Sequence, residues 1–257
     1  MNEIEKYEIF KEILDLNERV FKYEIDGELV YVKQREKNKK HIGHFFQGLL
    51  YKITKNPMLI PTVLSNNENE VIFEAEQIRT LNKAGISVPT VLFGNEDYFV
   101  MSDTGESLKE YMKANIKRKD FYIEKAIELL SELHSKSFAH GGSQIRNFTI
   151  KNEKISLIDF EEKIPNEYIK DFQKRDILIF ILTLQKGNFD PNVQEICDIY
   201  SKISLNKNIF IELQGFLLKF RWIKFLNSSI FKKIRMKDVR DFIAIIEKFS
   251  DVKKENK

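Results

Sequence analysis

Two short stretches near the middle of the chain have the residue types and spacing of a reactive site. They are the loop His140–Asn147, which reads HGGSQIRN, and the segment Leu157–Glu161, which reads LIDFE. Between them the sequence predicts a short strand, a tight turn at Asn152-Glu153 and a second strand. A hairpin of this length brings Asn147 and Asp159 to one side of a cleft. An amide and a carboxylate that meet there can share a divalent cation.

The loop, hairpin and acid resemble those of the lipopolysaccharide core (Kdo/heptose) kinases, an atypical bacterial family of the protein-kinase-like superfamily. That family usually reads His-Gly-Asp-x-x-x-x-Asn and then Ile-Asp-Phe. The match here is His140 to Asn147 followed by Ile158–Phe160, with Gly142 at the position of the catalytic Asp. The resemblance spans roughly residues 20–185. It implies that Asn147 and Asp159 are catalytic residues that hold Mg²⁺, which bridges the phosphates of ATP.

A lysine and a glutamate in the first third of the chain extend this resemblance. Lys33 ends a predicted strand that follows an Asp-Gly turn, the strongest short hairpin signal. It is either the lysine that reaches the nucleotide phosphates or an ordinary strand-end lysine in solvent. Glu74 lies on the inner face of a helix predicted from Asn66 to Lys83, whereas Glu76 lies on the outer face. An inward carboxylate needs a partner, and Lys33 is the expected one.

A second predicted hairpin leads to the expected adenine site. It pairs residues 90–93 with 98–101, and the pattern breaks at Ser102-Asp103-Thr104-Gly105. In the family this is the connection between the two lobes. The resemblance therefore implies that the backbone groups of Val100, Met101 and Ser102 meet adenine.

Gly142 leaves two interpretations of the activity open. In the first, the protein transfers phosphate without the usual acid, because positioning and charge neutralisation supply most of the rate. Glu161, Glu162 or a side chain of the loop 143–146 then substitutes for the base, and Arg146 can instead steady the transferred phosphate. In the second, the protein is a pseudokinase that binds nucleotide and regulates or scaffolds a partner.

Residues 34–69 form an insertion relative to a minimal kinase lobe. Its basic start is followed by apolar residues at helical spacing from Ile42 to Ile53. The segment 35–53 either docks on an anionic membrane surface or packs on its own lobe. The membrane alternative defines a third class of function, a surface-binding module that needs no ATP.

The remainder of the chain predicts helices. The ranges are 107–114, 121–135, 177–184 and at least two more within 208–249. His140 is expected to be buried and to brace the loop. Asp176, at the start of the helix 177–184, is expected to bond the loop backbone or to cap the helix, and Cys197 is expected to be buried. Basic residues between Lys219 and Lys237 either receive an anionic substrate or form a solvated face.

Composition narrows the class of protein. The chain has 257 residues, 42% of them apolar and 32% charged, with a net charge of +3, so we expect no nucleic-acid partner. The single cysteine excludes an intrachain disulfide. We expect no signal peptide, because the first residues alternate charged and apolar positions, and no apolar run of the sequence approaches the ~20 residues that span a membrane. We expect a cytoplasmic protein, soluble or peripheral at the inner face of the cytoplasmic membrane.

These observations predict an α+β, two-lobed, protein-kinase-like fold. The N-lobe is a small antiparallel sheet with the insertion, residues 1–101, and the C-lobe is larger and helical, residues 102–257. The predicted function is ATP- and Mg²⁺-dependent phosphorylation of a sugar hydroxyl. The resemblance implies that this sugar belongs to an anionic glycolipid, the lipopolysaccharide core. The alternative is the pseudokinase.

Overall fold

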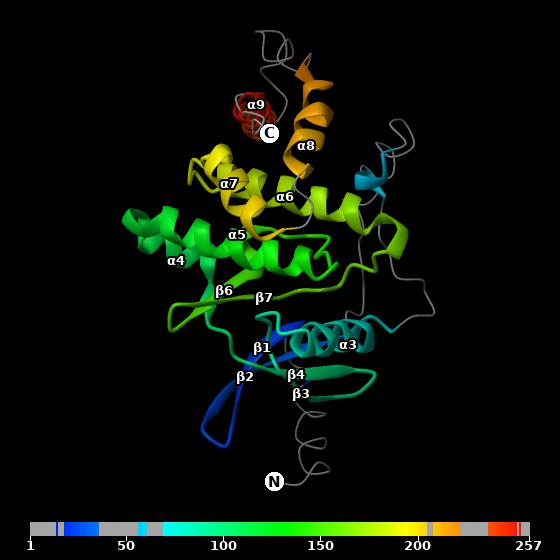
Figure 1. Ribbon diagram of the computed structural model, residues 1–257. Coiled ribbons are helices and arrows are strands. Elements are labelled where there is room, and N and C mark those ends of the chain that lie inside the picture. Colours follow the sequence, from blue (N-terminus) through cyan, green and yellow to red (C-terminus); the bar gives the residue numbers. More distant parts are fainter. Residues whose placement is uncertain are drawn as a thin grey trace.

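The chain folds into an α+β structure with two antiparallel sheets and several helices. The computed structural model describes residues 14, 18–35, 56–60, 69–204, 208–221, 236–250 and 252. A four-stranded sheet with one helix forms the lower part of the molecule, here called the sheet half (Figure 1). Helices around a three-stranded sheet form the upper part, here called the helical half (Figure 1).

The larger sheet contains both predicted hairpins. Its strands, in the spatial order β1-β2-β4-β3, are β1 Val20–Ile25, β2 Glu28–Gln34, β4 Tyr98–Ser102 and β3 Val91–Gly94. Asp26 and Gly27 make the two-residue turn of the first hairpin, with φ angles of 52° and 82°. Positive φ at both central positions is the geometry that an Asp-Gly turn favours. The predicted strands are therefore confirmed: β1 and β4 are one residue longer, β2 is one residue longer at each end, and β3 is shifted by one residue.

Alternation along the strands separates the two faces of this sheet. Val30, Val32 and Val100 are buried on one face, together with Tyr98. The opposite face carries Lys33, and it packs against the helix α3, Glu70–Lys83. Asn69 caps this helix by accepting hydrogen bonds from the backbone N–H groups of Val71 and Ile72. The helix therefore begins at Glu70, later than the predicted Asn66, because the cap residue itself is outside the helix.

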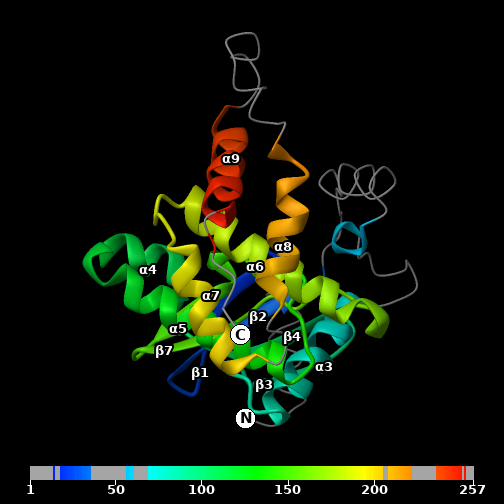
Figure 2. The ribbon, with the colours of Figure 1, turned by 45° about the horizontal axis from the view of Figure 1, so that its top comes forward.

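The helical half follows the larger sheet in the chain. Its elements are β5 Glu106–Ser107, α4 Leu108–Ala114, α5 Lys119–Ser135, β6 Phe148–Lys151, β7 Lys154–Leu157, α6 Ile169–Lys186, α7 Val193–Ile203, α8 Ile209–Leu218 and α9 Met236–Ser250. Figure 2 shows α8 and α9 rising from the side of α6 and α7 that faces away from the sheet half. All five apolar positions predicted to form the inner face of α5 are buried, namely 123, 126, 127, 130 and 133.

The helix α6 differs from the prediction. It begins at Ile169 rather than near Ile177, and its first turns already place Phe172 and Gln173 on a buried face. Asp176 is consequently an interior helical residue, and its interpretation as a helix-capping acid is wrong. Cys197 is half-buried rather than buried.

Hydrogen bonds across the junction fix the sheet half against the helical half. The Leu157 N–H donates to the Ser87 carbonyl at 2.9 Å, and the Ser87 and Ser156 hydroxyls are 3.0 Å apart. Lys136 Nζ donates to the Ala84 carbonyl at 2.8 Å. These contacts join the end of α3 to β7, the strand that leads to Asp159. They therefore set the distance between Lys33 and Glu74 in the sheet half and Asn147 and Asp159 in the helical half.

A short described part of the insertion, residues 57–60, contacts the helical half. Pro57–Leu59 forms a single 3₁₀ turn against α6, with Met58 buried. Arg175 Nη1 on α6 donates to the Ile60 carbonyl at 3.4 Å. The predicted amphipathic helix 42–53 and its basic start lie outside the described residues, apart from Arg35. Residues 57–60 therefore pack on α6, whereas the two ends of the insertion meet the sheet half: the Arg35 N–H donates to the Asp97 carbonyl at 2.8 Å, and Asn69 Nδ2 donates to the Glu96 carbonyl at 2.6 Å.

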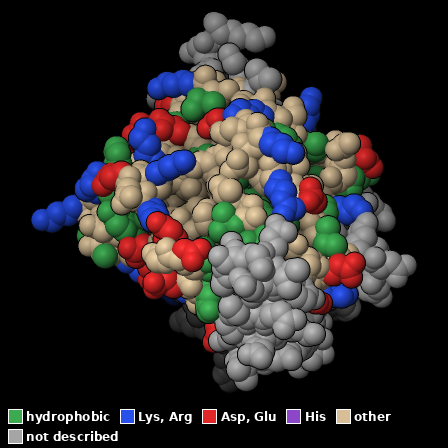
Figure 3. Space-filling model, turned by 90° about the horizontal axis from the view of Figure 1, so that it is seen from below, with side chains coloured by type: hydrophobic (Ala, Val, Ile, Leu, Met, Phe, Trp, Pro, Cys, Tyr) green, Lys and Arg blue, Asp and Glu red, His purple; other side chains and the backbone are tan. Residues whose placement is uncertain are grey.

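The surface of the described residues mixes charges of both signs. Viewed from below, Lys and Arg side chains alternate with Asp and Glu side chains and with apolar groups (Figure 3). Among the described helices, none is both long and apolar enough to cross a lipid bilayer.

Candidate functional site

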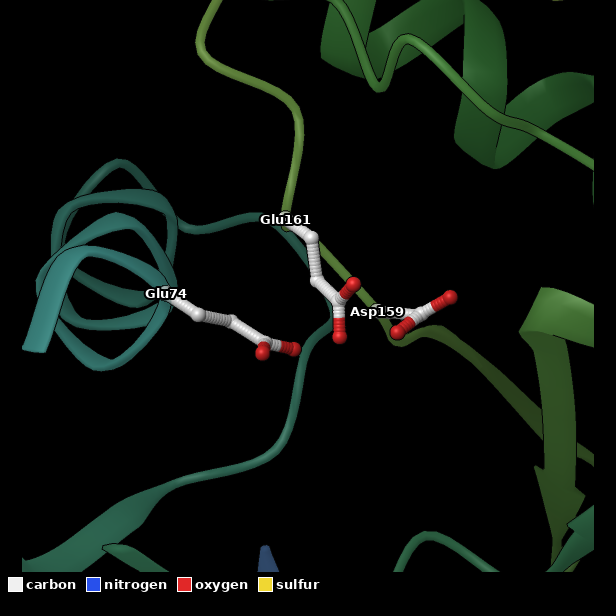
Figure 4. A group of neighbouring side chains, drawn as sticks. All are labelled: Glu74, Asp159 and Glu161. Carbon is white, nitrogen blue, oxygen red and sulfur yellow. The ribbon is translucent and has the colours of Figure 1, made fainter. Parts of the chain in front are cut away.

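Lys33 is the centre of a group of charged residues that both halves contribute. Its Nζ lies 2.7 Å from Glu74 Oε2 of α3, 2.8 Å from Asp159 Oδ1 and 2.7 Å from Glu161 Oε1. Figure 4 shows the three carboxylates pointing toward one another, from α3 on one side and from the segment after β7 on the other. The predicted ion pair between Lys33 and Glu74 is confirmed, and both side chains are buried. Lys33 is therefore not a solvated strand-end lysine.

The charges of this cluster are strongly coupled. Burial opposes a charge on Lys33, but the carboxylates of Glu74, Asp159 and Glu161 raise the pKa of this lysine above its ordinary value. Burial also opposes a charge on Asp159, yet Lys33 beside it lowers the pKa of this carboxyl to about 2. Both groups are therefore charged at neutral pH. Arg19 adds a second cation by pairing with Glu161.

Three carboxyl groups face these two cations, and burial raises the pKa of one of them, Glu74, to about 7, although Lys33 opposes the shift. The closest oxygens of Glu74, Asp159 and Glu161 lie within 4.8 Å of one another, a spacing that could hold a metal ion. In this structure the ammonium group of Lys33 bonds all three. Its three N–H donors are thus committed. A phosphate oxygen can bind Lys33 only if one of the carboxylates gives way.

Asn147 and Asp159 come together as their spacing predicted. The predicted strands on either side of Asn152-Glu153 are present as β6 and β7, and the turn residues have φ angles of 50° and 64°. Asn147 Nδ2 lies 3.4 Å from Asp159 Oδ2, and it donates to the Gly142 carbonyl at 2.9 Å. One carboxylate oxygen of Asp159 therefore faces Lys33 and the other faces Asn147.

Asp159 has an unusual backbone conformation. Its φ angle is 73°, in the left-handed region, which costs a residue with a side chain roughly 1–2 kcal/mol. Asp tolerates this region better than most residues. The turn of the chain at this point directs the carboxylate back toward Lys33 and Asn147. Such strain persists only where surrounding contacts hold it, here the ion pair with Lys33.

Hydrogen bonds from α6 hold the loop 140–147 in place. Asp176 is fully buried, and its Oδ2 accepts from the His140 N–H at 2.7 Å, while Ser143 Oγ donates to the Asp176 carbonyl at 2.6 Å. The predicted contact between Asp176 and the loop backbone is confirmed. The Nε2 of His140 is 2.9 Å from the Ile158 carbonyl, so this nitrogen carries the proton and Nδ1 accepts from the Gly142 N–H. His140 is buried and braces the loop, as predicted.

The two glycines of the loop have different surroundings. A Cβ added at Gly142 would meet no atom within 4 Å, whereas one added at Gly141 would lie 2.7 Å from Glu162 Cβ. Gly141 also has a φ angle of 83°. Only Gly141 therefore requires glycine. At Gly142 the loop has open space beside the backbone.

Glu162 is the acid that packs against Gly141. Its Oε1 lies 3.7 Å from an Arg175 nitrogen, and its Oε2 is buried with no hydrogen-bond partner among the described residues. Burial raises the pKa of Glu162 to about 7, with Arg175 opposing the shift. By contrast, Glu161 is bonded to Lys33 and Arg19, so it is not available to accept a proton in this arrangement.

The residues expected to meet adenine lie at the end of an interior strand. β4 pairs with β2 on one side and with β3 on the other, with Val100 opposite Val32 and Met101 opposite Tyr31. The Ser102 N–H donates to the Thr90 carbonyl at 2.9 Å. The backbone groups of Val100 and Met101 therefore face neighbouring strands. The strand pairing of β4 ends at Ser102.

Arg146 lies apart from the Lys33 cluster. Its side chain is exposed and lines a separate cavity with residues of α4 and α6. That Arg146 steadies the transferred phosphate stays a prediction.

Two contributors were not predicted from the sequence. Arg19 has no motif around it, and its pairing with Glu161 depends on the fold. His134 ends the predicted helix α5, and its Nε2 lies 3.2 Å from Asp176 Oδ2 while its Nδ1 lies 2.9 Å from the Tyr200 hydroxyl. A buried polar residue on an apolar helix face was the signal that could have identified His134.

Comparison with known proteins adds little to this description. No known protein family matches the chain. An uncharacterized protein of Haemophilus influenzae is 25% identical over 243 residues, which cover 93% of this chain and 92% of that protein. The chain is thus similar along nearly its whole length to a protein whose printed description names no activity.

Proposed function

We propose that the chain has a protein-kinase-like fold and is a phosphotransferase that uses ATP and Mg²⁺ to phosphorylate a sugar hydroxyl. The sheet half is then the N-lobe and the helical half the C-lobe. The observation that carries this proposal is the meeting of Lys33, Glu74 and Asp159, contributed by both halves, beside the Asn147–Asp159 pair. An acidic cluster alone would not support it, because such clusters also occur as structural networks.

The residues present fit Mg²⁺ and nucleotide phosphates. Mg²⁺ prefers hard oxygen ligands and is commonly bound by one or two protein groups plus phosphate oxygens. Asp159 is ionised well below neutral pH, and one of its oxygens faces Asn147. Asn147 would present its amide oxygen after a rotation of the amide. The ion, when bound, would neutralise charge on the phosphates.

The chain's own residues then have separate tasks. Lys33 would bind phosphate oxygens, and Glu74 would hold the ammonium group in place. Asp176 and His140 would keep the loop, and with it Asn147, in register with Asp159. Positioning of this kind can supply much of the acceleration of phosphoryl transfer.

The acceptor follows from the resemblance of the loop and hairpin to the lipopolysaccharide core kinases. We infer a sugar of an anionic glycolipid, met in the cytoplasm or at the inner face of the cytoplasmic membrane. The basic segment 35–53, outside the described residues for all but Arg35, is the part of the chain proposed to contact that membrane.

A pseudokinase is the second candidate, and Gly142 favours it. No side chain at this position can take the proton of the acceptor hydroxyl. Glu161, one of the proposed substitutes, is bonded to two cations. Such a protein would bind nucleotide without transferring its phosphate.

Two measurements test the proposal. ATP should raise the melting temperature in the presence of Mg²⁺ and not in its absence, and Asp159→Ala should remove the effect. No shift with any nucleotide would refute the nucleotide site.

Labelled ATP incubated with lipid A–core acceptors separates the two candidates. Label on the acceptor that disappears in Asn147→Ala identifies the enzyme. Nucleotide binding with no label on any envelope glycolipid identifies the pseudokinase.

A further inference from the structure

A cavity beside the loop gathers basic side chains that the proposed nucleotide site does not use. It measures about 160 Å³ and is lined by Lys109, Gln144, Ile145, Arg146, Thr183, Lys186 and Gly187. We propose that this cavity binds the anionic group, a phosphate or a carboxylate, of the sugar acceptor. The identity of the bound sugar as the acceptor rests on the proposed function, whereas the anion site itself does not.

The charges of the cavity are of one sign. Lys109, Arg146 and Lys186 come from α4, the loop and the end of α6, and no carboxylate is among the described residues that line the cavity. The acid closest to Lys109 is Glu110 at 4.0 Å, and Glu110 also bonds Lys113 at 3.0 Å. The three cations come from separate elements and line one cavity, so an anion placed there meets all of them.

The donors suit a phosphate or a carboxylate. An arginine guanidinium can bond two oxygens of either group at once, and lysine adds a mobile point charge. Gln144 contributes an amide as a neutral donor. The volume corresponds to roughly five water molecules at about 30 Å³ each. A single anionic substituent therefore fits.

The walls of the cavity are anchored to the proposed reaction site. The Ile145 N–H donates to Thr183 Oγ1 of α6 at 3.0 Å, and the Asn147 N–H donates to the Gln144 carbonyl at 2.8 Å. Arg146 lies between these two bonded positions and directly precedes Asn147. An anion held by Arg146 is thus fixed relative to Asn147, Gly142 and Asp159. This geometry reassigns Arg146 from the transferred phosphate to the acceptor.

Lys186, taken alone, needs no binding site to explain its position. Lys186 is the last residue of α6, where the helix dipole favours a cation. The dipole does not account for Lys109, which lies in the first turn of α4, where a cation is unfavourable. Convergence of the three on one cavity is the feature that a binding site explains.

The test is equilibrium binding to the full-length protein without ATP or Mg²⁺. The probes are glucose 6-phosphate, glucuronate and glucose, followed by calorimetry. We expect one of the anionic sugars to bind and glucose not to bind, and the arm that binds shows whether the site takes a phosphate or a carboxylate. Equal binding of glucose, or no binding of either anion, would overturn the proposal.

Variants locate the site. Arg146→Gln and Lys186→Gln should each raise the dissociation constant about tenfold, since each removes a charge-assisted hydrogen bond. Lys170→Gln, an exposed lysine of the same helix α6, is the matched control and should leave the constant unchanged. If either variant fails to fold, Lys109→Gln replaces it.

A second readout separates this proposal from the nucleotide site. The Mg²⁺-dependent thermal shift with ATP should be the same in Arg146→Gln and in the wild type. Loss of that shift in Arg146→Gln would place the arginine at the nucleotide and refute the acceptor role. Conversely, sugar binding that persists when ATP gives no shift leaves the anion site intact and refutes only the proposed function.

Discussion

The cluster around Lys33 and the loop around Gly142 lie on either side of the same Asp159, yet they are built in opposite ways. The cluster is dense in charge, and each of the three Lys33 donors has a carboxylate within 2.8 Å. The loop is held by backbone hydrogen bonds and the buried Asp176, and it has open space at Gly142. Both regions therefore bury polar side chains, but the loop also has an unfilled position at Gly142.

The difference shows that the loop's shape does not depend on an acid at Gly142. His140, Ser143 and Asn147 keep their contacts with α6 and the hairpin although position 142 has no side chain. In the cluster, by contrast, removal of Lys33 would leave the buried carboxylate of Glu74 without a cation. Substitutions should therefore change activity at the loop and binding or stability at the cluster.

Restoring the acid is expected to have the largest effect. Gly142→Asp should increase phosphate transfer to the acceptor by about 10²–10⁴-fold, the usual contribution of a general base. The substitution fits because an added Cβ meets no atom within 4 Å. Transfer of label from ATP is the measurement.

The neighbouring glycine provides the control for that substitution. Gly141→Ala places a Cβ 2.7 Å from Glu162 in a left-handed backbone, so it should lower the free energy of unfolding, whereas Gly142→Ala should not. If Gly142→Asp folds normally and transfers no more label than the wild type, a missing base is not what limits the reaction.

The second-largest effect is expected from removal of the Asp159 carboxylate, which lies between Lys33 and Asn147. Asp159→Asn should weaken binding of ATP in the presence of Mg²⁺ by about a hundredfold, because it removes both the charge beside Lys33 and the proposed metal ligand. The Mg²⁺-dependent thermal shift measures it. Asp97→Asn, an exposed acid in the turn between β3 and β4, should bind ATP like the wild type. Equal affinities of Asp159→Asn and Asp97→Asn would remove the cluster from the nucleotide site.

Removal of Asp176, which supports the loop, should lower the stability of the fold more than it affects nucleotide binding at the Lys33 cluster. Asp176→Ala should reduce the free energy of unfolding by about 3 kcal/mol, since the His140 N–H and His134 lose a buried charged acceptor. Urea denaturation followed by circular dichroism measures this. The control is Asp171→Ala on the same helix, where the ion pair with Lys174 is partly exposed and its loss should cost less than about 1 kcal/mol. Similar losses for both variants would show that Asp176 does not support the loop.

The smallest expected effect is a pH dependence at Glu162. Its pKa is raised by burial from 4.5 to about 7, so the folded state binds the proton more tightly than the unfolded state. The resulting stability is fully present below about pH 4.5 and is lost as the pH rises through about 7. Glu162→Gln should therefore flatten the decrease in unfolding free energy between pH 5 and 8, by about 2 kcal/mol. Glu167→Gln, an exposed acid, should retain the wild-type slope, and an unchanged slope in Glu162→Gln would contradict the assignment.

Part of the site followed from local patterns in the sequence. The Asp-Gly turn, the hairpin after Asn147 and the inward face of α3 depend on residues close together in the chain, and the structure has all three. The choice of Glu74 over Glu76 was correct for the same reason: Glu74 is buried, whereas the carboxylate of Glu76 is exposed and bonds Arg79. Periodicity alone decides which side of a helix a residue occupies.

Other features depended on contacts between distant segments. The start of α6 was misplaced because polar residues at its beginning have no apolar periodicity, while Phe172 and Gln173 are buried by elements elsewhere in the chain. The positions of Arg19 beside Glu161 and of Arg146 in a cavity with Lys109 and Lys186 have no local signal.

The sequence by itself therefore determined the strands and helices, the hairpin that joins Asn147 to Asp159 and the absence of an acid at Gly142. Only the tertiary structure decided that the three donors of Lys33 are already occupied and that Arg146 lies away from them. The physical reason is that turns and helix faces arise from neighbouring residues, whereas the pairing of buried charges depends on how the two halves are held together at Ser87 and Leu157.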